Sequence, residues 1–241
     1  MRDFFVVARK EVKELLSVRD SRRSLIIQML VLVGWMGVFM PLQDPEVWVV
    51  TPAMSVFLPL LVTGGVVADS FAGERERKTL ETLLATRLPD HAIFLGKVAG
   101  VVCYSWGMTV LVMGIGLVAA NLARGADFPS PGELAGRLIA AALVAGLVAG
   151  VGVLISLRAR TVREAQQTLS LVFVLLPFLL VFAVPAIIRR MPAAMKQQAA
   201  DMLASADPMV LGLAAMVALG VVDAALLAFG IRRFQRARLI L

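Results

Sequence analysis

The sequence has few of the residue types that enzymes and metal-binding domains use at their sites. Among 241 residues it contains one cysteine, Cys103, and one histidine, His91, so it has neither an internal disulfide nor the set of Cys and His ligands of a structural zinc site. It has a single tyrosine, whereas a basic surface that binds nucleic acid would want interleaved aromatic residues. No Ser nucleophile elbow or metal-spaced carboxylates accompany His91, which argues against an enzyme.

Charge is also scarce, and the apolar residues occur in long runs. The sequence is 59% hydrophobic and 17% charged, with a mean hydropathy of +0.85. A run of about 20 apolar residues matches the hydrocarbon core of a bilayer. We therefore expect an all-α, polytopic membrane protein whose residues 1–241 form a single transmembrane domain. Its six predicted spans lie at 24–42, 47–68, 98–120, 138–157, 168–188 and 210–231.

The N-terminal segment 1–23 has charges throughout and no uninterrupted apolar stretch, so it does not resemble a secretory signal. Its apolar residues instead recur with helical spacing, which predicts an amphipathic helix along the inner membrane surface. One face holds Phe4, Phe5, Ala8, Val12, Leu15 and Leu16, and the other holds Arg9, Lys10, Lys13 and Glu14.

The distribution of basic residues predicts the orientation. With six spans, 19 of the 24 Lys and Arg residues fall on the side that holds both termini, and such an excess marks the cytoplasmic side. We therefore expect a multi-pass protein of the plasma or inner membrane with both termini in the cytoplasm. The net charge of +7 then reflects this bias and the contact of the basic tail 232–238 with anionic lipid, and no nucleic acid is needed to explain it.

One polar segment stands out between the second and third spans. The stretch "FAGERERKTLETLLATRLPD", residues 71–90, holds four acidic and four basic residues within the cytoplasmic hairpin 69–92. We expect Ser70 to cap a helix in which Glu74 and Lys78 pair at i and i+4. One apolar face would follow, made of Leu80, Leu83, Leu84 and Leu88. Pro89 should end this helix and Asp90 should cap the next.

The balance of charge in this hairpin favours a protein partner. A patch that binds lipid would be basic, whereas alternating charges fix the register of a protein contact and exclude wrong partners. The alternative is the solvated face of an ordinary loop helix.

This hairpin, together with "ARKEVKELLSVRDSRR" ahead of the first span, resembles the type-2 family of ABC transporter permeases, the membrane subunits of exporters. That family often reads Gly-Glu-Arg-Glu-Arg, a residue, Thr-Leu-Glu, a residue, Leu-Leu at this place. Two positions depart from the pattern. Lys78 stands where the family usually has Gly, and Arg87 stands where the family often has a Pro directly after "LLAT". Both changes should lengthen the helix by about a turn.

The resemblance implies an amphipathic elbow helix in 1–23, a coupling helix in the hairpin, and a permease that carries no nucleotide site. ATP and magnesium would bind to two separate ATPase subunits, and a second permease, a copy or a paralogue, would complete the path. The sequence agrees, because "HAIFLGK" lacks the first Gly and the final Ser or Thr of a phosphate-binding loop. The elbow helix would be either an anchor alone or a part of the coupling. The alternative function is an ATP-independent secondary transporter, which should show internal repeats.

The resemblance also directs attention to particular residues. Polar contacts to an ATPase subunit are expected from Glu74, Arg75, Arg77 and Glu81, with Leu80, Leu83 and Leu84 packed beneath. Candidate residues of a translocation path are the polar side chains within the spans, namely Gln28, Ser55, Thr63, Thr109 and Asp223. Asp223 either faces a polar cavity or pairs with an arginine near the cytoplasmic surface. The apolar interior suits an amphipathic or lipid-like cargo and does not exclude an ion.

Two glycine pairs have the spacing of close helix contacts. Gly96 and Gly100, and Gly146 and Gly150, are each four residues apart. Such pairs let two helix backbones approach. Packing within the subunit is the preferred interpretation, and a seam between two copies is the alternative.

Overall fold

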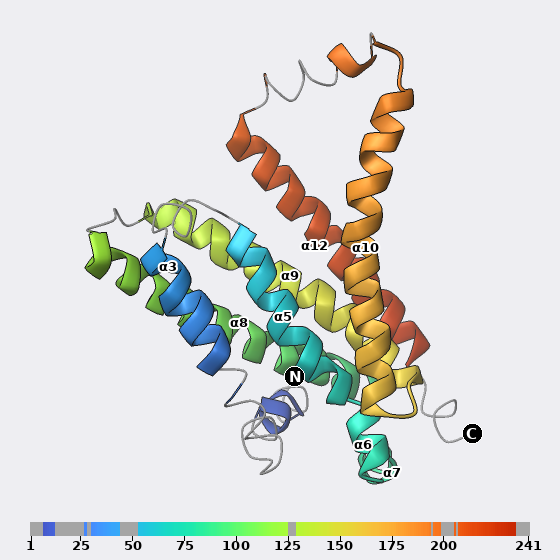
Figure 1. Cartoon of the computed structure of the whole chain (residues 1–241). Coiled ribbons are helices and arrows are strands. Elements are labelled where there is room, and N and C mark those ends of the chain that lie inside the picture. Colours follow the sequence, from blue (N-terminus) through green and yellow to red (C-terminus); the bar gives the residue numbers. More distant parts are fainter. Residues whose placement is uncertain are drawn as a thin grey trace.

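The structure is a computed structural model, and every regular element in the residues that it describes is a helix (Figure 1). The described residues are 7–12, 27, 30–43, 53–124, 129–193, 195–198, 205 and 207–234. The long helices are α5 (Ala53–Asp69), α8 (Asp90–Arg124), α9 (Pro131–Arg158), α10 (Val162–Arg190) and α12 (Pro208–Arg233). The short ones are η1 (Val33–Phe39), α3 (Met40–Gln43), α6 (Ala72–Glu76) and α7 (Leu80–Leu84), and residues 7–12 form a further helical segment. The all-α prediction is thus confirmed for the described residues.

Polar caps set where two long helices begin. The hydroxyl of Ser130 accepts the N–H of Glu133 at 3.3 Å ahead of α9, and a carboxylate oxygen of Asp207 accepts the N–H of Met209 at 2.9 Å ahead of α12. Both helices therefore begin before the predicted spans 138–157 and 210–231, because a capping turn precedes each apolar run.

Three of the described helices are long and apolar enough to cross a bilayer, and they lie within α8, α9 and α12. The predicted spans 24–42 and 47–68 begin in residues outside the described ranges. Their described parts contain the apolar helix Leu30–Phe39 and α5, respectively. The membrane-spanning character of the chain is therefore supported, and the count of six spans stays a prediction.

α9 lies at the centre of the bundle and contacts α5, α8 and α12. A Cβ atom added to Gly152 would overlap the side chain of Val67, so α5 and α9 are in very close contact. Gly146 and Gly150 face α12, where Cβ atoms would lie 2.9 Å from a carboxylate oxygen of Asp223 and 3.7 Å from Leu226. This glycine pair serves packing within the subunit, as preferred from the sequence.

The second glycine pair receives the helical segment 7–12. Cβ atoms on Gly96 and Gly100 of α8 would collide with Val7 and Glu11. Val7 and Glu11 are accordingly buried, whereas Lys10 of the same segment is exposed. The sequence pattern had placed neither Val7 nor Glu11 on the apolar face, which it assigned to Ala8 and Val12 in this segment.

The first apolar helix contains a π-helical segment, η1, that the sequence did not predict. Met36 and Gly37 of η1 are buried, and a Cβ atom on Gly37 would lie 3.5 Å from the carbonyl oxygen of Val112 in α8. A π-helical turn alters the angular spacing of side chains, and here it accompanies close contact with α8.

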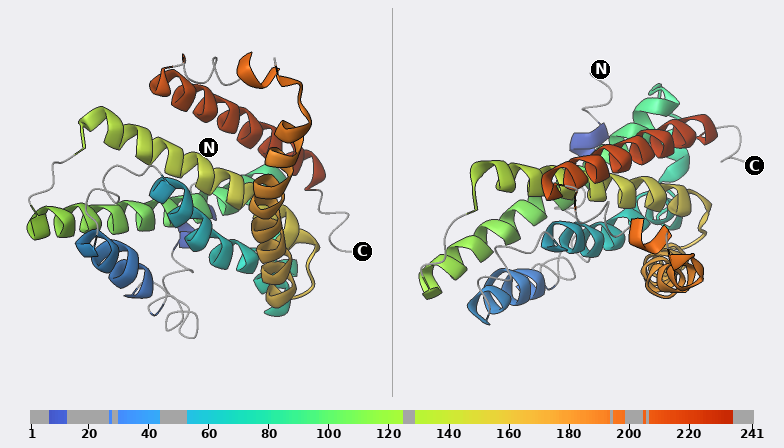
Figure 2. Two further views of the ribbon diagram at one scale, coloured as in Figure 1. Left: turned by 45° about the horizontal axis from the view of Figure 1, so that its top comes forward. Right: turned by 90° about the horizontal axis from the view of Figure 1, so that it is seen from above.

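α10 and α12 form the outer part of the molecule. Viewed from above, α10 is seen end on while α8, α9 and α12 run across the view, so α10 crosses them steeply (Figure 2). The apolar side chains of α12 are largely exposed, including Met209, Val210, Leu213, Val217, Val221 and Phe229. Such an apolar surface fits contact with lipid or with another protein.

Candidate functional site

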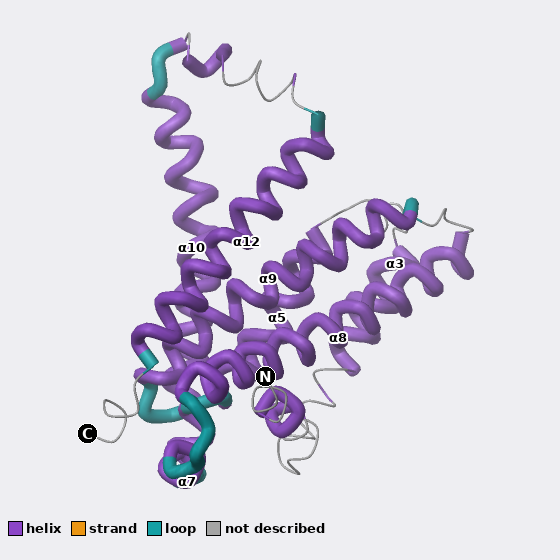
Figure 3. Tube along the Cα trace, turned by 180° about the vertical axis from the view of Figure 1, so that it is seen from behind, coloured by secondary structure: helices purple, strands orange, loops and turns teal. Residues whose placement is uncertain are grey.

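The hairpin that joins α5 to α8 projects beyond the ends of the long helices (Figure 3). Together with the segment 7–12 and the link between α9 and α10 it forms one end of the bundle, hereafter the charged end (Figure 1). The hairpin consists of two short helices, α6 and α7, and not of the single helix ending at Pro89 that the sequence predicted.

The break between α6 and α7 falls at Lys78. Its φ of 56° places it in the left-handed region, and its N–H bonds to the carbonyl of Arg75 at 3.1 Å while the N–H of Thr79 bonds to that of Glu74 at 2.9 Å. This pair of bonds is the Schellman motif that ends helices. The expected lengthening by a turn was therefore wrong: the chain keeps the glycine-type conformation at Lys78 although the residue has a Cβ atom.

Ser156 of α9 caps the start of the hairpin from a distance in the sequence. Its hydroxyl accepts the N–H groups of Phe71 at 3.1 Å and Ala72 at 2.9 Å and donates to the carbonyl of Ala68 at 2.9 Å. Ser70, the predicted cap, instead donates to the carbonyl of Val67 at 2.7 Å. The turn from α5 into α6 is thus fixed to α9 by one buried hydroxyl.

Lys97 of α8 lies at the centre of a buried ionic network. Its ammonium nitrogen is 3.0 Å from carboxylate oxygens of both Glu11 and Glu74 and donates to the carbonyl of Ser70 at 2.7 Å. Lys97 is 1% exposed, Glu74 3% and Glu11 6%. The ammonium group also lies 5.0 Å from the centroid of the Phe71 ring. Lys97 therefore ties together three elements, namely the segment 7–12, α6 and its own helix α8.

Glu74 takes part in this network and not in the predicted pair with Lys78, which lies beyond the end of α6. One carboxylate oxygen of Glu74 meets Lys97, and the exposed Lys10 is 3.9 Å away from the same oxygen. The other oxygen is buried and makes no hydrogen bond within the described part of the chain. A buried charge of this kind is stable only with its partners in place.

Arg75 and Glu76 connect α6 to the link between α9 and α10. Arg75 donates to the carbonyls of Leu157, at 2.9 Å, and Ala159 at the C-terminal end of α9. Glu76 accepts the N–H of Val162, the first residue of α10, at 2.9 Å. A cation at the end of one helix and an anion at the start of the next both suit the helix dipoles.

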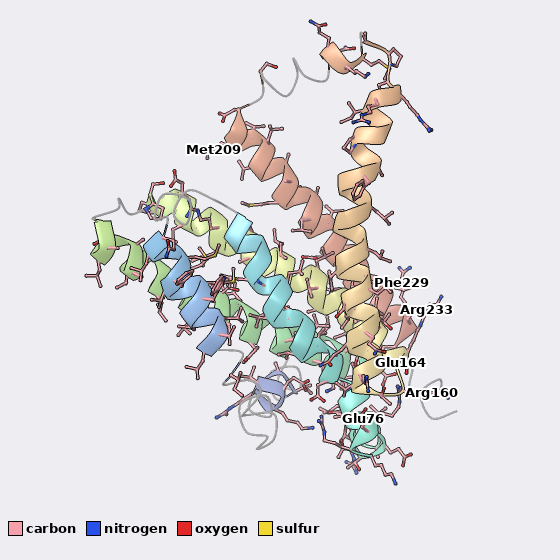
Figure 4. All side chains as sticks on the ribbon, in the orientation of Figure 1. Glu76, Arg160, Glu164, Met209, Phe229 and Arg233 are labelled. Atoms are coloured by element: carbon pink, nitrogen blue, oxygen red, sulfur yellow. The ribbon has the colours of Figure 1, made fainter. Side chains whose placement is uncertain are left out.

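The N-terminus of α10 is also capped within its own sequence. The hydroxyl of Thr161 accepts the N–H of Glu164 at 3.1 Å, and the carboxylate of Glu164 accepts the N–H of Arg160 at 2.8 Å. Figure 4 shows Glu76, Arg160 and Glu164 gathered where α6 meets the start of α10. The link between α9 and α10 is thus held from both sides.

The apolar side of the hairpin packs into the bundle. Leu80 and Leu83 of α7 are buried in the core cluster that contains Phe71 and Phe94, and Leu88 packs against it. The side chain of Leu84 lies outside the described residues. The prediction that leucines of this segment form one apolar face is confirmed for Leu80 and Leu83.

The outward side of the hairpin carries charges of both signs. Arg77 and Glu81 are exposed, and Arg77 pairs with Asp69 at 3.1 Å. Further exposed residues are Glu76, Lys78, Thr79, Thr82, Ala85, Arg87 and His91. Of the predicted polar contacts, Arg77 and Glu81 therefore lie on the surface, whereas Glu74 is buried and Arg75 bonds to α9.

Two of the predicted path residues, Thr63 of α5 and Thr109 of α8, lie in the parts of these helices away from the charged end. The hydroxyls of Thr63 in α5 and Ser105 in α8 are 2.5 Å apart, and Thr109 donates to the carbonyl of Ser105 at 2.9 Å. All three are fully buried; the Thr63–Ser105 contact joins the two helices, whereas the bond of Thr109 lies within α8. Gln28 and the side chain of Ser55 lie outside the described residues.

Asp223 of α12 is half-buried against Gly146 of α9. No ion pair with an arginine is found for it within the described part of the chain, and one of its carboxylate oxygens is buried without a hydrogen-bond partner there. The predicted pairing with an arginine is thus not seen. In the same described part, no three Cys, His, Asp or Glu side chains gather closely enough to hold a metal ion.

Glu11, Lys97 and Ser156 were missed by the sequence reasoning. A partial signal existed for Lys97, because it lies directly after Gly96 and three residues before Gly100. Small residues at this spacing indicate that another helix packs closely there. Ser156 gave no local signal, because its partners lie 84 and 85 residues away in the sequence.

The comparisons with known proteins agree with this architecture. A family model described as "ABC-2 family transporter protein" matches residues 46–226, which include α5 to α10 and most of α12. A search of curated proteins found no match. The matched range covers most of the chain and includes the whole hairpin. The chain therefore belongs to the ABC-2 transporter family, as a membrane-embedded transport subunit.

Proposed function

We propose that this chain is the permease of an ATP-driven exporter and that an ABC ATPase subunit contacts the hairpin of α6 and α7. Two ATPase subunits would bind ATP and magnesium, and a second permease, identical or paralogous, would complete the path. The observation that carries the proposal is the way the hairpin is held: its outward side is exposed and charged, while its inner side is bonded to four other helical elements.

The bonds of the hairpin make it suited to transmitting movement. Ser156 and Arg75 join it to α9, Glu76 joins it to α10, and Lys97 joins it to α8 and to the segment 7–12. A displacement of the hairpin by an ATPase subunit would therefore move several helices as one body, which is the physical requirement for a conformational change driven from one end.

The residues of the predicted contact divide into two groups. Arg77 and Glu81 are on the surface, and we assign the polar contact with the ATPase subunit to them, with Leu80, Leu83 and Leu84 beneath. Glu74 and Arg75 serve inside the subunit, where they hold the hairpin to Lys97 and to α9.

The distribution of basic residues supports the orientation that we propose. In the proposed topology the charged end and both termini face the cytoplasm of a cell whose plasma or inner membrane holds the chain, in accord with 19 of 24 basic residues on that side. The path itself would run near the polar residues of the spans, Gln28, Ser55, Thr63, Thr109 and Asp223. Of these, Asp223 has an unbonded buried oxygen within the described part of the chain.

Charge reversal on the exposed surface tests the proposal. The variants Arg77→Glu and Glu81→Arg, alone and combined, would be purified as the full chain, and copurifying ABC ATPase would be identified by mass spectrometry. We expect retention of the ATPase to fall at least about tenfold, because like charges facing each other across an interface cost several kcal/mol. The chain should stay folded, because the exposed pair with Asp69 contributes at most about 1 kcal/mol.

Arg190→Glu is the control, because Arg190 is exposed at the far end of α10. It should retain the ATPase like the unchanged chain. Full retention and full ATPase stimulation in the combined hairpin variant would refute the contact, and absence of any ABC ATPase from the unchanged complex would favour a transporter that works without ATP.

A further inference from the structure

A pocket of about 610 Å³ lies at the charged end between α9 and α12. Three arginines line it: Arg75 of α6, Arg158 of α9 and Arg233 of α12. Apolar side chains, among them Leu154, Leu226 and Phe229, form the rest of the wall. Figure 4 shows Phe229 and Arg233 together at the end of α12 that lies near the charged end.

The order of residues along the two helices gives this pocket a polar end and an apolar end. Arg158 is the last residue of α9 and Arg233 the last residue of α12. Leu154 precedes Arg158 by four residues, and Leu226 precedes Arg233 by seven. Leu157 and Phe234, which stand next to Arg158 and Arg233, also line the pocket. At 1.5 Å rise per residue the apolar wall therefore begins beside the arginines and extends to about 10 Å from them along the helices.

The positive charge of the arginines at the polar end exceeds the negative charge of the two helix C-termini there. Arg75 already bonds to the carbonyls of Leu157 and Ala159, so a cation other than Arg158 already lies at the end of α9. Two helix C-termini together carry about one negative charge, against three guanidinium charges. The described residues that line the pocket include no carboxylate, so the excess is positive.

The side chain of Arg233 makes no hydrogen bond or ion pair within the described part of the chain. Its guanidinium carbon lies 5.3 Å from the centroid of the Phe229 ring. A guanidinium group that lies over an aromatic ring can still direct N–H groups to an anion, and a pair of guanidinium groups suits the oxygens of a phosphate.

We propose that this pocket binds one membrane phospholipid with an anionic headgroup. The phosphate would lie between Arg158 and Arg233, and one acyl chain would run along Leu154, Leu226 and Phe229. The chain of the lipid would continue onto the exposed apolar surface of α12, because Val222, four residues before Leu226, is 46% exposed. The apolar wall favours a lipid over a free phosphate compound, and the proposal does not depend on the proposed function.

Lipid binding to the full chain in neutral detergent tests the proposal by native mass spectrometry. The probes are dioleoylphosphatidylglycerol, dioleoylphosphatidylcholine with the same chains, and glycerol phosphate without chains. We expect phosphatidylglycerol to bind the unchanged protein more tightly than either of the other probes. The double variant R158Q/R233Q should weaken its binding about 30-fold, since each arginine contributes roughly fivefold.

The matched control is Arg232→Gln, because Arg232 is exposed beside Arg233 and does not line the pocket. It should bind phosphatidylglycerol like the unchanged protein. A second variant, Leu226→Trp, keeps all the arginines and fills the apolar part of the pocket, so it should also weaken the binding of phosphatidylglycerol. If R158Q/R233Q fails to fold, the binding measured with Leu226→Trp tests the proposal. Equal binding by R158Q/R233Q and R232Q would overturn the proposal, as would phosphatidylcholine or glycerol phosphate binding as tightly as phosphatidylglycerol.

Discussion

At the scale of single residues, Lys97 has the largest expected effect on stability. It is enclosed by Glu11 and Glu74, and each of these charges is buried only because the others are present. The outward residues Arg77 and Glu81, by contrast, contribute little to folding, which leaves them available for a partner.

Replacing Lys97 by methionine should destabilise the chain by about 3 to 5 kcal/mol, because two carboxylates would remain buried without their cation. Thermal unfolding of the purified chain in detergent measures this effect. Lys10→Met is the control and should cost less than about 1 kcal/mol, since Lys10 is exposed and 3.9 Å from Glu74. The triple variant with Glu11→Gln and Glu74→Gln should recover most of the loss, and a Lys97→Met chain as stable as the unchanged one would contradict the network.

Lys78 offers an opposite test, in which a substitution stabilises. Glycine at this position should raise stability by roughly 0.5 to 1 kcal/mol, because a residue with a Cβ atom is strained at a φ of 56°. Lys78→Ala keeps the Cβ atom and should give no such gain. If the glycine and alanine variants unfold at the same temperature, the left-handed conformation is not the source of strain.

At the scale of elements, the hairpin of α6 and α7 is defined by contacts with segments distant in the sequence. Its start depends on Ser156 and its position on Arg75 and Glu76, whose partners lie in and after α9. The hairpin and the link between α9 and α10 therefore form one structural unit.

Ser156→Ala should open the start of α6, because two amides and one carbonyl lose their buried partner, at a cost of about 1 to 3 kcal/mol. Hydrogen exchange followed by mass spectrometry should show faster exchange in residues 71–76. Ser70→Ala, which removes one bond to the carbonyl of Val67, is the matched control and should leave that exchange almost unchanged. Equal protection in both variants would show that Ser156 does not fix the hairpin.

The sequence was sufficient to predict the helical class and the hairpin between the second and third spans, because apolar runs and Leu spacing are local signals. It also predicted that Gly146 and Gly150 pack within the subunit. It failed where distant contacts decide the outcome: Ser70 is the local candidate for a cap, but Ser156 is closer in space to the free amides. It failed at Lys78 as well, because helix propensity favours continuing the helix while the Schellman bonds end it.

At the scale of the whole molecule, the charged end and the outer helices have different surfaces. The charged end is bonded internally and shows mixed charges outward, which suits a protein partner. α12 shows a continuous apolar surface along its length, which suits lipid or a second permease. The two surfaces are joined through α9, which contacts α5, α12 and the hairpin.

The central claim is that the outward side of the α6 and α7 hairpin contacts an ATPase subunit, and photo-crosslinking tests it most directly. A photoreactive amino acid would replace Glu81, or Arg190 as the control at the far end, in the full chain within its native membrane. The account predicts that position 81 forms a crosslink to an ABC ATPase subunit and that position 190 does not. A hairpin that crosslinks to no ATPase, or an ATPase that crosslinks at position 190 instead, would contradict it.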